Sequence, residues 1–502
     1  MRKMITWPLL LVMVMLAAVP GAYAEGSFSM AGYDDESVGH DWTMNLFFER
    51  MEAQTGLKLE LQQYTSAAQW TKMKADMLSG SMEMPDALFK AALTMEETQA
   101  MYDAGLLLDL APLLPEHAPN LAALLDSHPE WREAITLPGG QIVALPYIDT
   151  LQFNNCMWIN QNWLLQLGLT EPTNLEELTE VLRAFKATDL NGNGKDDEVP
   201  LTFATLWDLR FLLHAFGVNA NDYYITTDEA GSVRQILTSD ENRAFLEWLR
   251  EMWNEGLLDR SGFSGLQNLS GNPSKDTPVT YGVMLTSTPA NLVFVDHVTQ
   301  YGTLDPLMYD GRQVYRDMTG DVIRGTFAIS AKCADPAALL RWVDFLYTEE
   351  GFILSEAGQA GSEFDWNDDG TWLWTDSAET LMNVTLPTAT LRSGTPMPGM
   401  ASVPFQKKLD DPTTVHIITE LESVKDIDSL PYPQRWLTAE TVKKANELVY
   451  RIGSYAEQQM VWFVVGDVEL NDETWAEFCQ TVVDLGADEL AGLFQQALVP
   501  AN

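Results

Sequence analysis

The sequence predicts an α/β protein that begins with a parallel, doubly wound sheet. Near the start, strand-like and helix-like segments alternate in the order strand, helix, strand, helix, strand, which is the pattern of such a sheet. The chain of 502 residues is too long for one hydrophobic core and suits two or three lobes. Its composition, with 46% hydrophobic and 20% charged residues, is that of an ordinary globular protein.

The elements of this first sheet follow from hydrophobic periodicity. Residues 28–30 and 57–61 are predicted strands, the second with leucine at every other position. Apolar side chains recur at helical spacing over residues 42–51 and 70–77, and a third strand begins within residues 85–89. Three strands joined by two helices therefore open the chain.

The loops at the carboxyl ends of these strands are the first candidates for a binding site, because ligands of parallel sheets collect there. They span residues 32–41, 64–70 and 90–95. Carboxylate and amide groups can bind hydroxyls, and aromatic rings stack on the apolar C–H faces of sugars. The candidate ligand residues from these loops are Asp34, Asp35, Tyr64, Trp70 and Lys90, and Tyr147 is a further candidate at a later strand end or crossover.

The first 24 residues have the organisation of a secretory signal. Arg2 and Lys3 precede an apolar run over residues 7–19, and Ala22-Tyr23-Ala24 forms a small-x-small cleavage site. We therefore expect cleavage after Ala24 and an extracytoplasmic mature protein. No later stretch reaches the roughly 18 apolar residues that a membrane span needs.

The formal charge of the chain is −42 at pH 7. Such a surface repels nucleic acid and anionic lipid, so neither is an expected partner. A neutral ligand is the simpler expectation, although a local basic patch could still accept an anionic one.

The three cysteines, Cys156, Cys333 and Cys479, are far apart and allow at most one disulfide, and we expect them to be small buried hydrophobes.

Residues 189–198, DLNGNGKDDE, place oxygen ligands at alternate positions around a glycine turn. An EF-hand needs a bidentate glutamate at its twelfth position, where this chain has Pro200, so we expect a structural calcium loop that is not an EF-hand. A solvated Asn/Gly/Asp turn is the alternative. The expected calcium ligands are Asp189, Asn191, Asn193, the Lys195 carbonyl, Asp197 and Glu198.

The run from Trp163 through Pro200, which contains this loop, resembles the extracellular solute-binding proteins of oligosaccharide ABC importers. The resemblance is greatest to the larger calcium-containing members related to alginate- and fructan-binding proteins, and it extends over nearly the whole mature chain. It implies a two-lobed periplasmic-binding-protein-like fold (type II) with discontinuous lobes and a hinge. Most Gram-positive relatives have a cysteine at the cleavage site, whereas the first cysteine here is Cys156, so we expect no lipid attachment.

The resemblance also implies a division of the chain. Residues 1–24 are expected to be the signal peptide, residues 25–150 and 303–360 lobe 1, and residues 151–302 and 361–502 lobe 2. Crossovers between the lobes are expected near Tyr147, Gly302 and Gly361.

Lobe 2 is expected to supply its own ligand contacts. The polar loop after a predicted strand at residues 280–285 matches a ligand-facing loop of related proteins, and it offers Thr288 and Asn291. Trp207 follows another predicted strand and is a third candidate. From Gln434 onward the chain is predicted to be mainly helical.

A second calcium-like spacing occurs within residues 365–376. Its polar residues imitate the first loop, but an Asp-Gly hairpin between two alternating strands explains them with fewer assumptions. We expect the hairpin and leave a second metal as the alternative. The residues concerned are Asp365, Asn367, Asp369, Gly370 and Asp376.

No sequence motif of an enzyme is present. There is no HExxH, GxSxG or GxxxxGK[ST] pattern, and with 72 acidic residues no carboxylate pair stands out. The resemblance implies a monomeric, non-enzymatic receptor that captures an oligosaccharide between its lobes for the permease of an ABC importer. The alternatives are a secreted glycan-active enzyme and a calcium-dependent cell-surface interaction protein.

Overall fold

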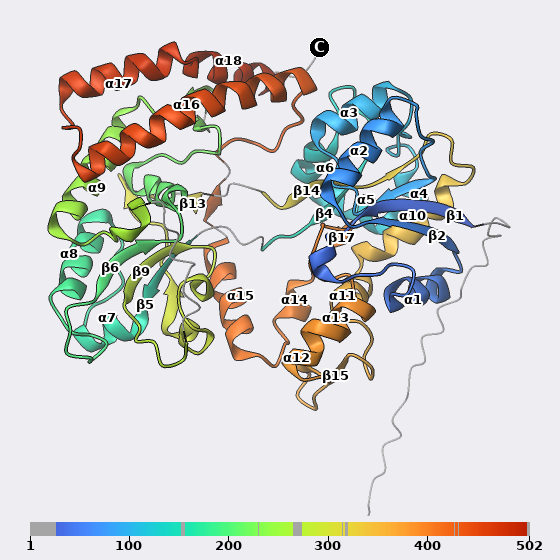
Figure 1. Ribbon diagram of the computed structural model, residues 1–502, viewed down its shortest axis with the longest axis horizontal. Coiled ribbons are helices and arrows are strands. Elements are labelled where there is room, and N and C mark those ends of the chain that lie inside the picture. The colour runs from blue at the N-terminus through green and yellow to red at the C-terminus, as the bar shows by residue number, and fades with distance from the viewer. Residues whose placement is uncertain are drawn as a thin grey trace, which may run out of the picture.

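The computed structural model describes residues 27–151, 156–228, 230–264, 274–313, 315–316, 320–425, 427–429 and 431–498. The predicted signal peptide and its cleavage site lie outside the described residues. The described chain forms two lobes that several crossovers join in the middle of the molecule (Figure 1). None of its helices is long and apolar enough to cross a membrane.

Lobe 1 is built on a six-stranded mixed sheet with the order β17-β4-β14-β3-β1-β2. Strand β1 pairs in parallel with both β2 and β3, and helices α1 and α2 connect these three strands. The predicted alternation of strands and helices is therefore confirmed. The bounds are β1 Phe28–Tyr33, α1 Leu46–Thr55, β2 Leu59–Tyr64, α2 Ala67–Leu78, β3 Ala87–Phe89, β4 Leu145–Ile148, β14 Val322–Ile329 and β17 Gly399–Met400.

Helices cover both faces of this sheet. One core contains Trp70 of α2 and Met101 of α3 beside Leu88 of β3. The other contains Phe47 of α1 and Trp342 of α10 around Phe89 of the same strand. The remaining helices of this part are α3 Met95–Asp103, α4 Leu114–His117, α5 Pro119–Ser127, α6 Pro129–Ile135, α10 Pro336–Asp344, η7 Phe345–Tyr347 and α11 Glu349–Glu356.

Lobe 2 contains a four-stranded sheet with the order β10-β5-β9-β6. The helices predicted after Gln434 are present as α16, α17 and α18, and they lie across the top of lobe 2 in Figure 1. The bounds are β5 Cys156–Asn160, α7 Gln161–Leu167, α8 Leu175–Lys186, β6 Val199–Phe203, η2 Leu206–Phe216, α9 Asp240–Glu255, β9 Tyr281–Thr286, β10 Tyr301–Thr303, α16 Ala439–Val465, α17 Asp472–Asp484 and α18 Ala487–Leu498.

The structure differs from the predicted division in two places. The chain stays in lobe 2 beyond the crossover expected near Gly302, because Leu304 and Leu307 pack in the core of that lobe and the next strand of the lobe 1 sheet is β14.

The second difference follows residue 360. Strand β17 at Gly399–Met400 pairs with β4 in the sheet of lobe 1, and Phe364 and Trp372 pack beside Phe352 of α11. The chain joins lobe 2 at α15 (Pro412–Lys425), whose Leu421 packs in a cluster of that lobe. The boundary could not be read from the sequence because a two-residue strand has no hydrophobic period.

Short elements complete the fold. They are η1 Glu36–Val38, β7 Ile225–Thr227, β8 Val233–Gln235, η3 Ser261–Ser264, η5 Pro289–Asn291, η6 Val295–Gln300, β11 Met308–Tyr309, β12 Arg312–Gln313, β13 Tyr315–Arg316, β15 Phe364–Trp366, β16 Trp372–Trp374, α12 Ala378–Thr380, the π-helix η8 Leu381–Thr385, α13 Leu386–Ala389, α14 Val403–Gln406 and β18 Asp428–Ser429. Strands β15 and β16 are antiparallel, and Gly370 between them has a φ of +86°, so the predicted Asp-Gly hairpin is present.

Candidate functional site

The sheet edges at which the crossovers leave each lobe define where the two lobes meet. In lobe 1, Ile148 pairs with both Val322 and Met400, so three connections pass the same edge, which is also the carboxyl edge of β4. In lobe 2, Cys156 at the start of β5 pairs with Thr286 at the end of β9. The carboxyl edges of the two sheets therefore both lie at the crossovers.

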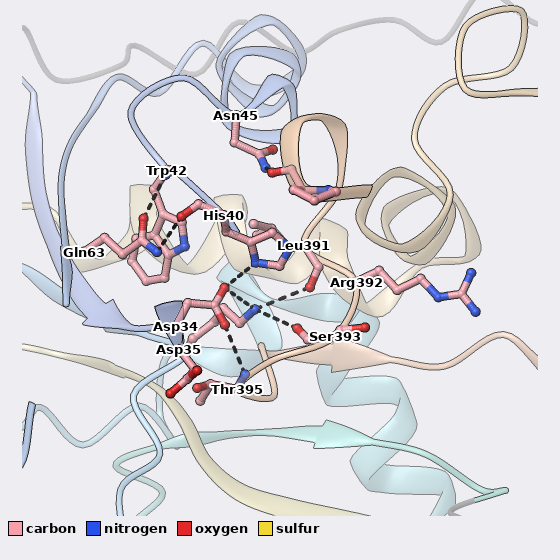
Figure 2. A network of polar contacts seen from close by, with 12 residues as sticks. Asp34, Asp35, His40, Trp42, Asn45, Gln63, Leu391, Arg392, Ser393 and Thr395 are labelled. Carbon is pink, nitrogen blue, oxygen red and sulfur yellow. Dashed lines mark hydrogen bonds and ion pairs between the residues drawn. The ribbon is translucent and has the colours of Figure 1, made fainter. Parts of the chain in front are cut away.

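A buried polar network occupies this edge of lobe 1 (Figure 2). Asp34 follows β1, and its Oδ2 lies 2.7 Å from Lys90 Nζ and 2.5 Å from His40 Nδ1. The other oxygen, Oδ1, accepts a hydrogen bond of 3.1 Å from the Thr395 amide. The side chains of Asp34 and Lys90 have no exposed surface. Burial raises the pKa of Asp34, but the His40 hydrogen bond and the Lys90 charge outweigh it, so the pKa is lowered.

Lys90 connects this network to a segment about 300 residues further along the chain. Its ammonium group donates to the carbonyls of Leu391 and Ser393 at 3.3 and 3.2 Å. The backbone here is strained, with φ of +48° at Lys90 and +72° at Ser393. At Gly394 a Cβ atom would lie 2.1 Å from Asp34 Oδ1, so only glycine fits this close approach. The segment 391–395 is thus fixed against the loop after β1.

The candidate residues of lobe 1 divide into buried and accessible ones. Asp34 and Lys90 are buried, so they support the edge and do not face solvent. Trp70, predicted to stack on a ligand, is 2% exposed and donates from Nε1 to the Ala91 carbonyl, which is a correction. Its ring belongs to the helical apolar stripe of α2. Asp35 is exposed and Tyr64 is half-buried, so these two remain accessible.

Other polar groups at this edge carry no signal in the sequence. Tyr147 and Asp149 are half-buried at the crossover that leaves β4, and burial raises the pKa of both. Burial also raises the pKa of Glu356, whose Oε2 lies 3.9 Å from Arg392 Nε. Of these, only Tyr147 was a candidate. The charges of Glu356 and Arg392 act on Tyr147, and packing between segments far apart in the sequence brings them near it, which no local pattern encodes.

The lobe 2 candidates lie after the parallel strands β6 and β9. Thr288 is half-buried and caps η5, and Asn291 is exposed, with its amide 3.0 Å from the Thr286 hydroxyl. Trp207 is half-buried at the start of η2. Because Phe203 pairs with Leu285, the ends of β6 and β9 coincide, and these residues share one edge of the sheet.

The predicted metal loop connects α8 to β6, as expected for residues 189–198. Asp189 accepts hydrogen bonds from the amides of Asn193 and Gly194 at 3.1 and 2.8 Å. Asp197 accepts from the side-chain amides of Asn191 and Asn193, both at 2.9 Å, and these bonds lower its pKa. Both aspartates, both asparagines and the turn glycine therefore converge.

The oxygen-bearing groups of this loop can be compared with the ligands that calcium accepts. The described residues contain no group of three or more His, Cys, Asp or Glu side chains suited to a metal. Calcium, however, also accepts amide and backbone oxygens. Rotating the Asn191 and Asn193 amides by half a turn would place their oxygens beside the Asp197 carboxylate, so these three side chains fit a calcium ion. Glu198 is 3% exposed and accepts from the Leu190 amide at 2.9 Å, which closes the loop.

Comparison with known proteins agrees with the two-lobed binding-protein fold. Residues 37–242 match the family described as "Bacterial extracellular solute-binding protein". The match covers less than half of the chain. It is 31% identical over 229 residues to the fructooligosaccharide ABC transporter substrate-binding protein FusA of Streptococcus pneumoniae. That alignment covers 43% of this chain and 42% of FusA.

Solved structures share the fold over almost the whole length. An HMO-binding, ABC-transporter-associated solute-binding protein from Bifidobacterium longum infantis has a TM-score of 0.76 at 21% identity, covering 94% of this chain and 98% of that one. FusA, as an EF-hand mutant with fructo-nystose, has 0.66 at 21% identity and the same coverage. The alginate-binding protein AlgQ2, solved without calcium ion, has 0.60 at 19% identity, covering 94% and 97%.

Proposed function

We propose that this protein is the substrate-binding component of a carbohydrate ABC importer, which captures an oligosaccharide between its lobes and delivers it to a membrane permease. The observation that carries the proposal is the position of the two carboxyl sheet edges, both at the crossovers between the lobes. The family match and the sugar-binding relatives support it. The protein acts outside the cytoplasm as a monomer.

Accessible groups from both lobes supply the ligand contacts. Asp35 offers carboxylate oxygens, and the half-buried rings of Tyr64 and Tyr147 offer faces for sugar stacking. From lobe 2, the proposed contacts are Asn291 and Trp207, with Thr288 beside them. A ligand that touches both edges favours a closed arrangement of the lobes, because it binds that arrangement more tightly.

The proposal is tested by a thermal-shift screen of neutral and acidic oligosaccharides, followed by calorimetry on those that stabilise the protein. We expect one class to bind without being consumed, and small-angle scattering to show a smaller radius of gyration with ligand. Failure of every oligosaccharide to bind would contradict the proposal. Turnover of the bound sugar would instead indicate an enzyme.

We also propose that residues 189–198 hold a structural calcium ion. The ligands are Asp189, Asn191, Asn193 and Asp197 with the Lys195 carbonyl, and Glu198 is the remaining acid of the loop. Calcium would supply charge neutralisation for the carboxylates at this helix-to-strand connection. A metal analysis of the purified protein should find about one calcium ion per chain.

For export, we propose cleavage after Ala24 with a free amino terminus at Glu25. Mass spectrometry of the native protein would measure this terminus directly. A terminus that begins at Met1, or that carries an acyl group, would contradict it.

A further inference from the structure

A small cavity lies inside lobe 2, between η2 and the helices α9 and α16. Its volume is about 90 Å³. Most of its wall is hydrocarbon, contributed by residues that include Leu209, Phe245, Leu249, Met460 and Val464. The two charged residues in the wall are Arg210 and Glu457. A charged side chain in such an apolar wall is costly unless it is paired and hydrogen-bonded.

Arg210 is 7% exposed and has an unsatisfied donor in this wall. Its Nη2 donates to Glu457 Oε1 at 3.0 Å, whereas its buried Nη1 has no hydrogen-bond partner among the residues that the structure describes. An arginine always carries its proton and can only donate. A buried donor left unpaired loses its hydrogen bonds to water without replacement, so the cavity lacks one acceptor atom.

Two aromatic rings hold the guanidinium group in place. The Arg210 Cζ lies 4.5 Å from the Tyr224 ring centroid and 5.6 Å from that of Trp207. Tyr224 has a φ of +58°, a strained conformation for a bulky residue, and its hydroxyl donates to Glu457 at 2.9 Å. In α16, Gly453 leaves room for this hydroxyl, since a Cβ atom there would come within 3.2 Å of it. The fold thus fixes the direction of the free donor.

We propose that this cavity is a second ligand site, which takes a small uncharged molecule with an apolar body and one hydrogen-bond-acceptor oxygen. The oxygen would accept from Arg210 Nη1, and the apolar body would fill the space between η2, α9 and α16. The ligand is uncharged because Glu457, whose side chain is exposed at the rim, already neutralises Arg210, and a second carboxylate placed in the cavity beside it would be repelled.

The size of the cavity sets the size of the ligand. An apolar cavity of about 150 Å³ takes benzene with its six carbons, so in proportion 90 Å³ suits a molecule of about four non-hydrogen atoms. Apart from Trp207, no residue of this site belongs to the proposed sugar contacts or to the calcium loop. The site therefore goes beyond the proposed transport function and does not depend on it.

The test uses acetone, which has two methyl groups and one carbonyl acceptor. Methyl-labelled protein is titrated with it and followed by two-dimensional NMR. We expect saturable shifts of the Leu249 and Val464 methyls, and contacts between these methyls and the methyl protons of the probe. Arg210→Met keeps an apolar stem without the donor, and it should weaken binding at least tenfold. Met460→Trp, from the half-buried side of the cavity, should abolish it.

The matched control is Arg260→Met in the same lobe. Arg260 is exposed and also lies over an aromatic ring, 5.0 Å from Trp253, but it does not line the cavity. This variant should bind the probe as the wild type does. Absence of saturable shifts in the wild type would overturn the proposal. So would equal binding by Arg210→Met, which would mean an apolar void in which the arginine has no role.

Discussion

Asp34 in lobe 1 and Asp189 in lobe 2 are both acids in polar loops, but their surroundings are opposite. Asp34 has no exposed surface and contacts a lysine, a histidine and a backbone amide. Asp189 is exposed and accepts hydrogen bonds from two backbone amides of its own loop. The first acid joins segments that are far apart in the sequence, whereas the second organises a turn of ten residues.

The comparison shows that the role of a carboxylate, structural or ligand-binding, can be inferred from the groups that surround it. A buried acid with a charged partner is a structural element whose loss leaves an uncompensated charge. An exposed acid among amide groups keeps its oxygens available, so a cation can replace the hydrogen bonds that it now accepts. Both acids looked like ligand-binding residues in the sequence, and only their surroundings separate them.

The largest effect that we expect is that of Lys90→Met. The variant leaves the Asp34 carboxylate buried without its ammonium partner, so the free energy of unfolding should fall by about 3–5 kcal/mol. Urea denaturation measures it. The control is Lys72→Met, which breaks an exposed ion pair with Asp76 on α2 and should change stability by about 0–1 kcal/mol. Equal effects of the two variants would contradict the comparison.

The free energy of unfolding, measured over a series of pH values, separates the contribution of Asp34 from that of its neighbour Asp35. Because the pKa of Asp34 is lowered in the folded protein, its contribution to stability is present above the unfolded value of about 4 and is lost as the pH falls through the folded pKa. Asp34→Asn should therefore flatten the loss of unfolding free energy below pH 4. Asp35→Asn should flatten it less, since Asp35 is exposed and solvent weakens its interactions.

The fold of lobe 1 could be predicted further than its polar site. The strand-helix alternation over residues 28–89 follows from local periodicity, and the structure confirms it. The segment 391–395 could not be connected to Asp34, because their contact depends on a lysine and on close packing at Gly394. Trp70 shows the same limit, since the sequence predicted it at the end of a strand-to-helix loop, whereas α2 begins at Ala67 and its direction turns the ring into the core.

In lobe 2 the candidate metal site itself could be predicted from the sequence, because all of its proposed ligands come from one short loop. All its proposed ligands lie within ten residues, so their spacing already predicts which side chains converge, and the hydrogen bonds between Asn193 and Asp197 agree. The sequence could not predict Arg210 in its cavity. That site needs η2, α9 and α16 together, and its two charged residues, Arg210 and Glu457, are 247 residues apart.

Calcium should stabilise the protein by less than the buried pair does. With dissociation constants of about 0.1–1 mM for extracellular calcium sites, ~1 mM calcium adds roughly 0.4–1.4 kcal/mol. A chelator should lower the melting temperature of the wild type, and Asp189→Ala should remove this response. The control is Asp196→Ala, which changes an exposed acid of the same loop that pairs with Lys186 and should leave the response intact. A chelator without effect on the wild type would refute the site.

The smallest effect on stability is expected for Asp35→Asn at neutral pH. The asparagine side chain can still accept the hydrogen bond from the Ser37 amide that begins η1, and the position is exposed, so the free energy of unfolding should change by less than about 0.5 kcal/mol. The affinity for the oligosaccharide found in the screen should nevertheless fall, because an amide offers one acceptor oxygen where the carboxylate offers two. Calorimetry measures the affinity and urea denaturation the stability. Unchanged affinity would remove Asp35 from the ligand contacts, whereas a loss of stability as large as that of Lys90→Met would show that the two adjacent acids do not differ as their burial implies.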